Sequence, residues 1–423
     1  MKVKIITLGC KVNHYDSQSI LRHLLQYGYE HASEEETPDV FVINTCAVTN
    51  ESERKSRQMI RRCRQSNPNA VIVVTGCVSE VNKENEISQA DIVTGTQNRD
   101  AIPEMIAVFL ETKEQQQCFD PIDRLSDGLT HFEGKTRATL KIQDGCGMYC
   151  TYCIIPYARN RIASMPMDTI IAAVKELCEE GYHEAVLTGI HLASYRDAEN
   201  HRLIDVLQHI NEETPIERLR LGSLEPKLLT EQFLSQLSTI KCFCPHFHIS
   251  LQSGSNEILK KMNRRYTAEE YFAITENVRK FFPDAMITTD VIVGFPGETE
   301  ALFEETVDFV KKVRFSHVHV FPFSPKKDTP AADYPDQIAK PIKHRRAETL
   351  IGIAEQIKQE IFSSCINEVH EVLTETVGTD GSALGYTENY LRTVIKDANA
   401  TNEIVRVRIV AHQSEYLLAE KMN

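Results

Sequence analysis

The sequence predicts an α/β protein in three parts: a doubly wound α/β domain, a central partial (β/α)6 barrel and a small all-β barrel at the C-terminus. Three observations predict this. Apolar runs alternate with amphipathic stretches over residues 1–125 and again over residues 132–362, and short β-branched runs separated by turn residues fill residues 366–423. With 423 residues the chain is also too long for one compact unit.

The first domain is predicted from continuous apolar runs at residues 3–8, 40–43 and 71–74. Helical patterns at residues 17–27 and 51–65 separate them. Short apolar strands between amphipathic helices are typical of a parallel sheet that is covered on both faces.

The second domain follows a segment, residues 115–135, that loses periodicity and is expected to be a linker. Strand and helix patterns then alternate up to a last helix at residues 343–363. Strands are expected at residues 137–142, 184–187, 218–221, 246–251, 287–293 and 317–321. Six strand–helix units predict a partial barrel and not the complete eight.

The third domain carries β-branched runs at residues 370–376, 390–394 and 404–410, with Gly, Asp and Asn turns between them. This pattern predicts a small all-β barrel.

Composition narrows the function. The net charge of −13, from 47 Lys and Arg against 60 Asp and Glu, excludes a globally basic nucleic-acid-binding protein but leaves room for a local basic face. No apolar run approaches the roughly 20 residues of a membrane span, and the start lacks the apolar run of a signal peptide, so a cytoplasmic protein without membrane association is expected. Twelve cysteines are too sparse for a disulfide scaffold and favour metal or redox use.

Cys146, Cys150 and Cys153 follow the strand predicted at residues 137–142, at the mouth of the barrel where active sites lie. Three thiolates at this spacing can hold a cubane cluster and leave its fourth iron open. The alternative is a zinc site or buried thiols, although structural zinc sites normally use four paired ligands. With Tyr152 before the last cysteine, the segment resembles the signature of radical S-adenosylmethionine enzymes. The resemblance implies that these cysteines are catalytic, as ligands of the radical-generating cluster.

Cys10, Cys46 and Cys77 each end an apolar run. Because the carboxyl ends of parallel strands meet at one edge of a sheet, we expect the three thiols to converge on a metal, with small buried hydrophobes as the alternative. Gly9 and Gly76 fit the close approach of backbone to a cluster. The other cysteines are assigned to packing: Cys63, Cys118, Cys178, Cys242, Cys244 and Cys365.

This layout, over essentially the whole chain, resembles the radical methylthiotransferases. Residues 8–13 (LGCKVN) and 44–49 (NTCAVT) are similar to the enzymes that act on threonylcarbamoyladenosine in tRNA. Enzymes for isopentenyladenosine carry Gln-Met-Asn after the first cysteine, and those for a ribosomal protein carry Pro-Lys-Asn. Further matches lie at residues 222–226, 251–255, 264–267, 290–297 and 385–390. Residues 323–330 depart from the usual Arg-Glu-Gly core.

The resemblance implies a methylthiotransferase domain at residues 1–125 with an auxiliary 4Fe-4S cluster, a radical S-adenosylmethionine core at 132–362 and an RNA-binding TRAM domain at 366–423. It implies conversion of N6-threonylcarbamoyladenosine at position 37 of tRNA to its 2-methylthio form. The implied cofactors are two 4Fe-4S clusters and S-adenosylmethionine. The implied partners are that tRNA, an electron donor such as flavodoxin or ferredoxin, and a sulfur source.

The same resemblance assigns Gly189, Glu225, Ser253 and Arg265 to S-adenosylmethionine binding, as strand-end or loop groups of the barrel. Each polar residue has a plain alternative. Glu225 precedes Pro226 and would cap a helix, Ser253 would stabilise a turn, and Arg265 would be a surface charge.

A local basic face is predicted between residues 53 and 64, which hold six basic side chains and one acid. On a helix Arg54, Arg57, Arg61 and Arg64 share one face, and we expect it to contact tRNA phosphates, with a solvated face as the alternative. Residues 367–423 hold five Lys or Arg and nine Asp or Glu, so RNA contact there would need a local face. Candidates are Arg392, Lys396, Arg406 and Arg408.

Two other functions stay open. Within the family, the substrate would be isopentenyladenosine tRNA or a ribosomal protein. In another class, the chain would be a non-catalytic, metal-stabilised RNA-binding or electron-transfer protein.

Overall fold

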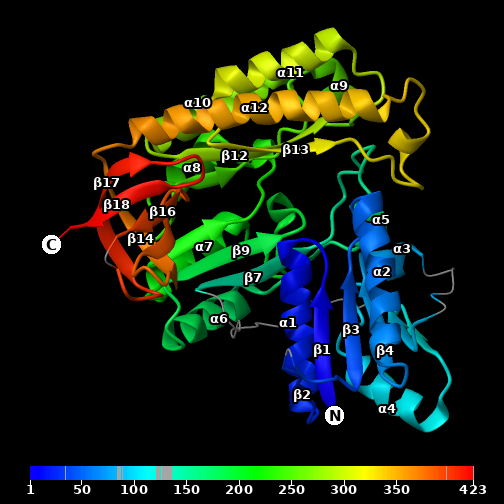
Figure 1. The fold of residues 1–423 in the computed structure, drawn as a ribbon. Helices are drawn as coiled ribbons and strands as arrows, with labels where there is room; N and C mark the ends of the chain where they lie inside the picture. Colours follow the sequence, from blue (N-terminus) through cyan, green and yellow to red (C-terminus); the bar gives the residue numbers. More distant parts are fainter. Residues whose placement is uncertain are drawn as a thin grey trace. The chain divides into compact units, whose positions relative to one another are not determined.

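The computed structural model describes residues 1–33, 35–82, 87, 89–120, 125, 136–396 and 398–422 (Figure 1). Two compact units account for the chain. Unit 1 comprises residues 1–129, 141–165 and 324–333, and unit 2 comprises residues 130–140, 166–323 and 334–423. This division does not follow the three predicted segments, because residues 141–165, which carry the C-x3-C-x2-C motif, fold with the N-terminal residues.

The sheet of unit 1 is parallel and runs in the order β2-β1-β3-β4-β5-β6. Its strands are β1 (Lys2–Thr7), β2 (Glu30–His31), β3 (Val40–Thr45), β4 (Val71–Gly76), β5 (Ile92–Thr94) and β6 (Gln116–Cys118). The central strands β3 and β4 are buried along their whole length, as the continuous apolar runs predicted. The linker prediction for residues 115–135 was wrong at β6, which pairs with β5, and residues 121–124 and 126–135 lie outside the described residues.

Helices cover both faces of this sheet (Figure 1). They are α1 (Lys11–Gln26), α2 (Asn50–Ser66), α3 (Cys77–Val81) and α4 (Ile102–Thr112). Val42 of β3 packs with α1 and α4 on one face, whereas Ile43 packs with Ile60 of α2 on the other. Successive side chains of a strand point to opposite faces, which explains this alternation.

Strand β7 (Arg137–Asp144) begins in unit 2 and ends in unit 1. In unit 1 its last residues pair antiparallel with β8 (Ala163–Ser164), and the short helix α5 (Ile155–Ala158) lies between the two strands in sequence.

The central strands of unit 2 belong to two sheets. They are β9 (Glu184–Gly189), β10 (Arg218–Leu221), β11 (His246–His248), β12 (Met286–Val293) and β13 (His317–Pro322). The sheet order is β10-β9-β7-β8 in one sheet and β11-β12-β13 in the other, and isolated bridges such as Leu224 to Ile249 join them. The strand predicted at residues 246–251 is shorter, because it ends at His248.

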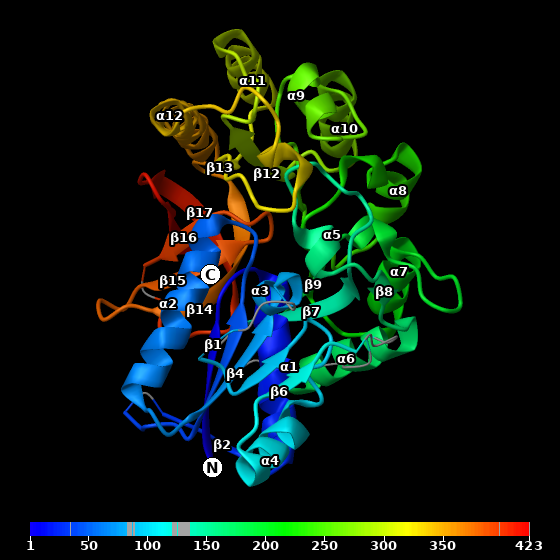
Figure 2. The same ribbon diagram turned by 90° about the vertical axis from the view of Figure 1, so that its right-hand side faces the viewer.

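Helices alternate with these strands, as predicted. They are α6 (Met167–Glu179), α7 (Leu203–Glu213), α8 (Glu231–Leu237), α9 (Asn256–Lys261), α10 (Ala268–Phe281), α11 (Glu300–Val313) and α12 (Lys340–Ser364). Figure 2 shows α10, α11 and α12 around β12 and β13. Within the described ranges, no helix combines the length and the apolar character that a membrane span requires.

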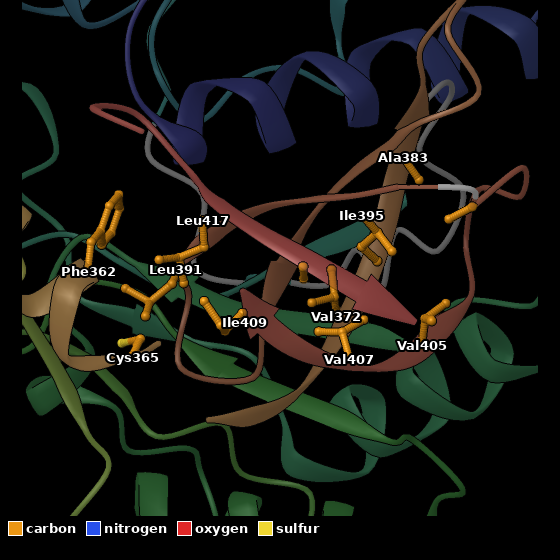
Figure 3. Packing of buried hydrophobic residues seen from close by; sticks show 12 residues of the cluster. Phe362, Cys365, Val372, Ala383, Leu391, Ile395, Val405, Val407, Ile409 and Leu417 are labelled. Atoms are coloured by element: carbon orange, nitrogen blue, oxygen red, sulfur yellow. The ribbon is translucent and has the colours of Figure 1, made fainter. Parts of the chain in front are cut away.

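The last residues of unit 2 form a closed barrel in the order β14-β15-β16-β18-β17. Its strands are β14 (Val369–Val377), β15 (Ala383–Thr387), β16 (Arg392–Ile395), β17 (Ile404–His412) and β18 (Leu417–Lys421). Val372, Ile395 and Val407 are among the side chains that fill it, and Phe362 of α12 completes the core (Figure 3). The predicted all-β barrel is confirmed, although β15 and β18 had no counterpart in the prediction.

The loop at residues 386–390 covers the beginnings of the barrel strands of unit 2. Arg220 of β10 donates to the main-chain oxygens of Thr387, at 2.9 Å, and Glu388, at 2.8 Å. The ring of Tyr390 stacks on that of His246, the first residue of β11, with 4.6 Å between centroids. The N-terminal edge of the strands is therefore closed, and their carboxyl edge is the one left for chemistry.

Candidate active site

Three cysteines lie at the carboxyl edge of the sheet in unit 1. They are Cys10, Cys46 and Cys77, hereafter the auxiliary triplet. Cys46 and Cys77 directly follow β3 and β4, and Cys10 lies three residues beyond the end of the adjacent strand β1. Cys46 and Cys77 are buried, and Cys10 is exposed at the start of α1. Burial, and to a lesser extent the charge of Cys10, raises the pKa of Cys46 and of Cys77, and the structure places the three predicted cysteines at neighbouring strand ends.

Two glycines make room for this triplet. A Cβ at Gly9 would lie 3.1 Å from the Sγ of Cys46. A Cβ at Gly76 would lie 2.5 Å from the Oδ1 of Asn44. Both glycines have positive φ, at 114° and 99°, which side-chain-bearing residues rarely adopt.

Burial makes the thiols of Cys46 and Cys77 weaker acids. It raises the pKa of Cys77 to about 11, where Arg159 acts in the opposite direction, and it also raises the pKa of Cys46. A metal would have to displace these protons, since only the thiolate is a ligand. Three converging sulfur donors beside glycine backbone fit a soft metal such as a cluster iron.

The second triplet, Cys146, Cys150 and Cys153, hereafter the radical triplet, lies on the loop between β7 and α5. Gly145 opens this loop with φ of 80°, and a Cβ there would lie 1.9 Å from the main-chain oxygen of Arg161. The amide of Met148 donates to the Sγ of Cys146 at 3.4 Å. Such amide contacts stabilise negative sulfur and are used around cluster ligands.

Both triplets belong to unit 1 and share a small apolar cluster. Ala47 and Val78, which follow Cys46 and Cys77, are buried with Ile154 and Ala158 of the segment after Cys153. The loops that bear the two triplets are therefore parts of one packed body.

Asn13, on α1, ties the auxiliary loops to each other. Its side-chain amide donates to the main-chain oxygens of Leu8, at 2.8 Å, and Thr45, at 3.0 Å. Its Oδ1 accepts from the Nη2 of Arg159 at 3.0 Å. Asn13 is 1% exposed, so these bonds are shielded from water.

A buried ion network surrounds Arg159. Its Nη1 donates to both carboxylate oxygens of Asp144, at 2.9 and 2.7 Å, and its Nη2 donates to Asp16 at 2.7 Å. Lys141 lies 2.8 Å from Asp16 and 2.5 Å from Asp144, and Arg99 lies 3.0 Å from Asp16. The sequence analysis missed this network, because its members are far apart in the chain.

Opposite charges in the network shift the pKa values of their partners. Burial alone would raise the pKa of Asp16, but Arg99, Lys141 and Arg159 hold it below its usual value. Burial alone would lower the pKa of Arg159, but Asp144 and Asp16 raise it well above its usual value. Burial lowers the pKa of Lys141, and Asp144 and Asp16 oppose this. The ion pairs therefore favour the charged forms of the two carboxylates and of Arg159.

In unit 2, Gly189 ends β9, and Glu225 lies in the segment that follows β10. One carboxylate oxygen of Glu225 accepts from Arg264 at 2.7 Å, while Oε1 is buried without a hydrogen-bond partner among the described residues. Burial raises the pKa of Glu225, and Arg264 opposes this. An orphaned carboxylate oxygen at this edge fits a ligand that donates hydrogen bonds, as S-adenosylmethionine does through its amino and hydroxyl groups.

The two other predicted cofactor residues differ from Glu225. Ser253 is fully buried, and its hydroxyl accepts from the amide of Ser255 at 3.2 Å and contacts the hydroxyl of Thr306 at 3.3 Å. Arg265 is exposed. The adjacent Arg264, which the sequence analysis did not select, is the arginine that pairs with Glu225.

One face of strands β11–β13 carries polar side chains. His248 contacts Thr288 at 2.9 Å and Asp290 at 3.1 Å, and His319 pairs with Asp290 in register. The opposite face carries buried apolar residues such as Phe247 and Val291. A complete barrel fills its interior with branched apolar side chains, and this polar face departs from that pattern.

On helix α2, Arg54, Arg57 and Arg61 are exposed, as the prediction of a basic face requires. Two of them have acidic neighbours: Arg54 pairs with Glu51 and Arg57 pairs with Glu53, at 2.6 and 2.8 Å.

Arg64 differs from the other arginines of α2. Its guanidinium donates to the main-chain oxygens of Pro68 and Ala70, at 3.1 and 2.8 Å, and to Asp91, at 2.7 Å. It therefore fastens the end of α2 to the sheet.

Family models match two parts of the chain. A model described as "Uncharacterized protein family UPF0004" matches residues 2–95, and that of the radical SAM superfamily matches residues 140–310. The first match contains the auxiliary triplet, and the second contains the radical triplet.

Relatives match almost the whole chain. A threonylcarbamoyladenosine tRNA methylthiotransferase, MtaB, of Bacillus subtilis is 38% identical over 96% of this chain and 92% of its own length. MtaB of Aquifex aeolicus is 36% identical over 97% and 100%. A tRNA-2-methylthio-N(6)-dimethylallyladenosine synthase of Clostridium botulinum is 33% identical over 99% and 96%.

Solved structures share the fold. The radical S-adenosylmethionine methyltransferase TsrM of Kitasatospora setae superposes with a TM-score of 0.60 at 13% identity, over 84% of this chain and 89% of that chain. The cobalamin-dependent radical enzyme OxsB gives 0.53 at 11% identity, over 85% and 56%. At these identities the likeness concerns the fold alone.

Proposed function

The chain belongs to the radical S-adenosylmethionine tRNA methylthiotransferases, and on this premise we propose that it converts N6-threonylcarbamoyladenosine at position 37 of tRNA to the 2-methylthio form. Relatives at 38% and 36% identity carry the name of that activity. Its cofactors are two 4Fe-4S clusters and S-adenosylmethionine.

The single observation that carries this proposal is the presence of two cysteine triplets in one packed unit. Each triplet provides three thiolates, one fewer than a cubane has irons, so each leaves an iron open to an exogenous ligand. A C–H bond of an aromatic ring is beyond the reach of side-chain bases, and the clusters with S-adenosylmethionine supply radical and sulfur-transfer chemistry when bound. Cys146, Cys150 and Cys153 would hold the radical-generating cluster, and Cys10, Cys46 and Cys77 the auxiliary one.

For S-adenosylmethionine, the unpaired Oε1 of Glu225 supports a direct hydrogen bond, with Arg264 orienting the carboxylate. Gly189 would offer strand-end backbone to the methionine amino group. Arg265 is accessible to a carboxylate or to phosphate. Ser253 would act through the shape of its turn, since its hydroxyl is already used there.

For the modified base, the polar face of β11–β13 supports a contact with the threonylcarbamoyl group. That group carries a carboxylate and amide hydrogens, which match imidazole donors and the acceptor of Asp290. His248 and His319 would therefore be substrate-orienting residues.

For the tRNA body, Arg54, Arg57 and Arg61 would contact phosphates. The closed C-terminal barrel is proposed to be a TRAM-like RNA-binding domain, with Arg392, Lys396, Arg406 and Arg408 as its cationic side chains. The reaction further needs an electron donor such as flavodoxin or ferredoxin and a source of sulfur.

The main alternative substrate is isopentenyladenosine tRNA, because relatives named as dimethylallyladenosine synthases reach 33% identity over 99% of this chain. The test is mass analysis of nucleosides in tRNA from cells with and without this protein. Loss of 2-methylthio-N6-threonylcarbamoyladenosine alone is expected. Loss of the methylthio-isopentenyl nucleoside instead would assign the other substrate.

A further inference from the structure

The ion network around Arg159 is deeply buried, and none of its side chains is assigned to the binding of tRNA or S-adenosylmethionine. Lys141 is fully buried, and Arg159 and Asp16 are each 2% exposed. Moving such charges out of water costs several kcal/mol per ion, and well-packed apolar side chains are often as stable. Stability alone therefore does not explain why these charges are here.

With all of its side chains ionised, the network carries an excess positive charge. Three cations, Arg99, Lys141 and Arg159, face two carboxylates, Asp16 and Asp144, which gives 3 − 2 = +1. Three cysteine thiolates at the auxiliary triplet would bring three negative charges next to it. The positive charge of the network would therefore be attracted to the negative charge of the thiolates that hold a cluster.

Arg159 is the member that meets both triplets. Its guanidinium lies close enough to Cys10 and Cys77 to act on their charge, and it bonds Asn13, which holds the loops before Cys10 and Cys46. Its main-chain oxygen accepts from the amide of Cys146 at 3.4 Å.

We propose that the side chain of Arg159 is a positioning group for the auxiliary iron site, which holds the loops of the auxiliary triplet in place and supplies a fixed positive charge to the auxiliary cluster. The inference rests on the proposed function, because it requires that cluster. A guanidinium suits the task, since it stays charged in proteins and its planar fork holds several acceptors at fixed angles.

This charge has a consequence for the reduction potential of the auxiliary cluster. Potentials of such clusters depend on nearby net charge and on hydrogen bonds to sulfur. A positive charge stabilises the reduced cluster, which carries one more electron. Removing the charge is therefore expected to lower the midpoint potential.

The test uses the full-length protein with the radical triplet replaced, Cys146→Ala/Cys150→Ala/Cys153→Ala, so that only the auxiliary cluster is bound. In this background four variants are compared: Arg159→Met, Arg159→Lys, Asp16→Asn and the double variant Arg159→Met/Asp16→Asn. Arg22→Met is the matched control, because Arg22 is an exposed arginine of α1 in the same unit. Iron content, iron release to a chelator and the midpoint potential by anaerobic titration with spin resonance are measured.

The network charge predicts an order of midpoint potentials. Asp16→Asn leaves 3 − 1 = +2 and should give the highest value. The double variant leaves 2 − 1 = +1 and should match the background protein. Arg159→Met leaves 2 − 2 = 0 and should give the lowest value, while Arg22→Met changes nothing.

Arg159→Lys separates position from charge. Lysine keeps the positive charge but lacks the planar guanidinium that holds several acceptors. The midpoint potential of the auxiliary cluster should therefore stay near that of the background protein, while iron is released to the chelator several-fold faster. Equal potentials in Asp16→Asn and the background protein would overturn the charge role, even if Arg159→Met fails to fold. Equal iron release by Arg159→Lys and the background protein would overturn the positioning role. A background protein without iron would contradict the auxiliary cluster itself, and with it this inference.

Discussion

The guanidinium of Arg220 lies 4.9 Å from the ring centroid of Tyr390, and the same guanidinium is paired with Glu184 at 2.6 Å. Arg220 and Glu184 belong to the barrel strands β10 and β9, whereas Tyr390 belongs to the loop between two strands of the C-terminal barrel. Arg220 therefore links the C-terminal barrel to strands β9 and β10, because its guanidinium contacts both Glu184 and the ring of Tyr390. The C-terminal barrel covers the N-terminal edge of these strands.

Substitution Tyr390→Ala is expected to lower the free energy of unfolding by about 2 kcal/mol, from the loss of the cation–π contacts and of two stacked rings. Urea unfolding of the cluster-loaded protein under anaerobic conditions measures this. Tyr390→Phe should retain most of the stability. Tyr27→Ala, at an exposed tyrosine of unit 1, is the control, and an equal loss there would contradict the attachment role.

Stability should also fall between neutral and alkaline pH through His370. Burial lowers the pKa of His370, but hydrogen bonds that its imidazole makes to Cys365 and Glu388 raise it to about 10 overall. An unfolded histidine titrates near 6.5. The stabilisation by charged His370 is thus complete below about pH 6.5 and is lost as the pH rises through about 10.

The urea midpoint at pH 6 and pH 9 tests this. The parent protein should lose more stability over that interval than His370→Gln, which has no charge to lose. Equal losses in both proteins would assign the pH dependence to other groups.

The arginines of α2 should separate into two kinds. Arg57→Gln and Arg61→Gln are expected to weaken tRNA binding and to reduce the salt dependence of log K by about one per lost phosphate contact. Arg64→Gln should instead lower the free energy of unfolding by about 1 kcal/mol, because the carbonyls of Pro68 and Ala70 lose their donor. Binding titrations at several salt concentrations and urea unfolding distinguish the two. Unchanged tRNA affinity in Arg57→Gln/Arg61→Gln would remove α2 from the RNA-binding surface.

Glu225→Gln is expected to weaken S-adenosylmethionine binding at least tenfold, or about 1.4 kcal/mol, because the buried acceptor pair is lost. Arg265→Gln is the neighbouring control, and a smaller effect is expected from this exposed side chain. Calorimetric titration of the cluster-loaded protein measures both. An unchanged affinity in Glu225→Gln would show that the orphaned oxygen does not face the cofactor.

Cys46→Ala should reduce bound iron from about eight to about four atoms per chain, since a cubane cannot be held by two thiolates. Cys63→Ala serves as the matched control, because Cys63 is also buried in unit 1 but packs in an apolar cluster. Iron analysis after anaerobic reconstitution gives the result. Loss of iron in Cys63→Ala, or none in Cys46→Ala, would contradict the assignment.

Much of the sheet in unit 1 was predictable, because β3 and β4 are buried on both faces and therefore read as continuous apolar runs. The auxiliary triplet was predictable for the same reason, since parallel strands place their ends at one edge. Short edge strands such as β6 (Gln116–Cys118) have no such signature, because a polar edge strand resembles a linker.

Other errors came from partners that are distant in sequence. Arg264 and Arg265 are adjacent and identical in type, and only the contact with Glu225 tells them apart. Arg64 fits the helical face of Arg57 and Arg61, yet its distance from Asp91 decides its role. For Arg159 the partners lie on α1 and β7, so no local pattern marks it.

The sharing of β7 between the two units constrains how this gene can be divided. A polypeptide that stops before β7 would keep Asp16 and Arg99 but would lose Lys141 and Arg159. The buried carboxylate of Asp16 would then have one cationic partner and not three. The N-terminal part on its own is therefore expected to be a poor acceptor of iron even with all three of its cysteines present. Evolutionary shuffling of this part as a free module would be disfavoured for the same reason.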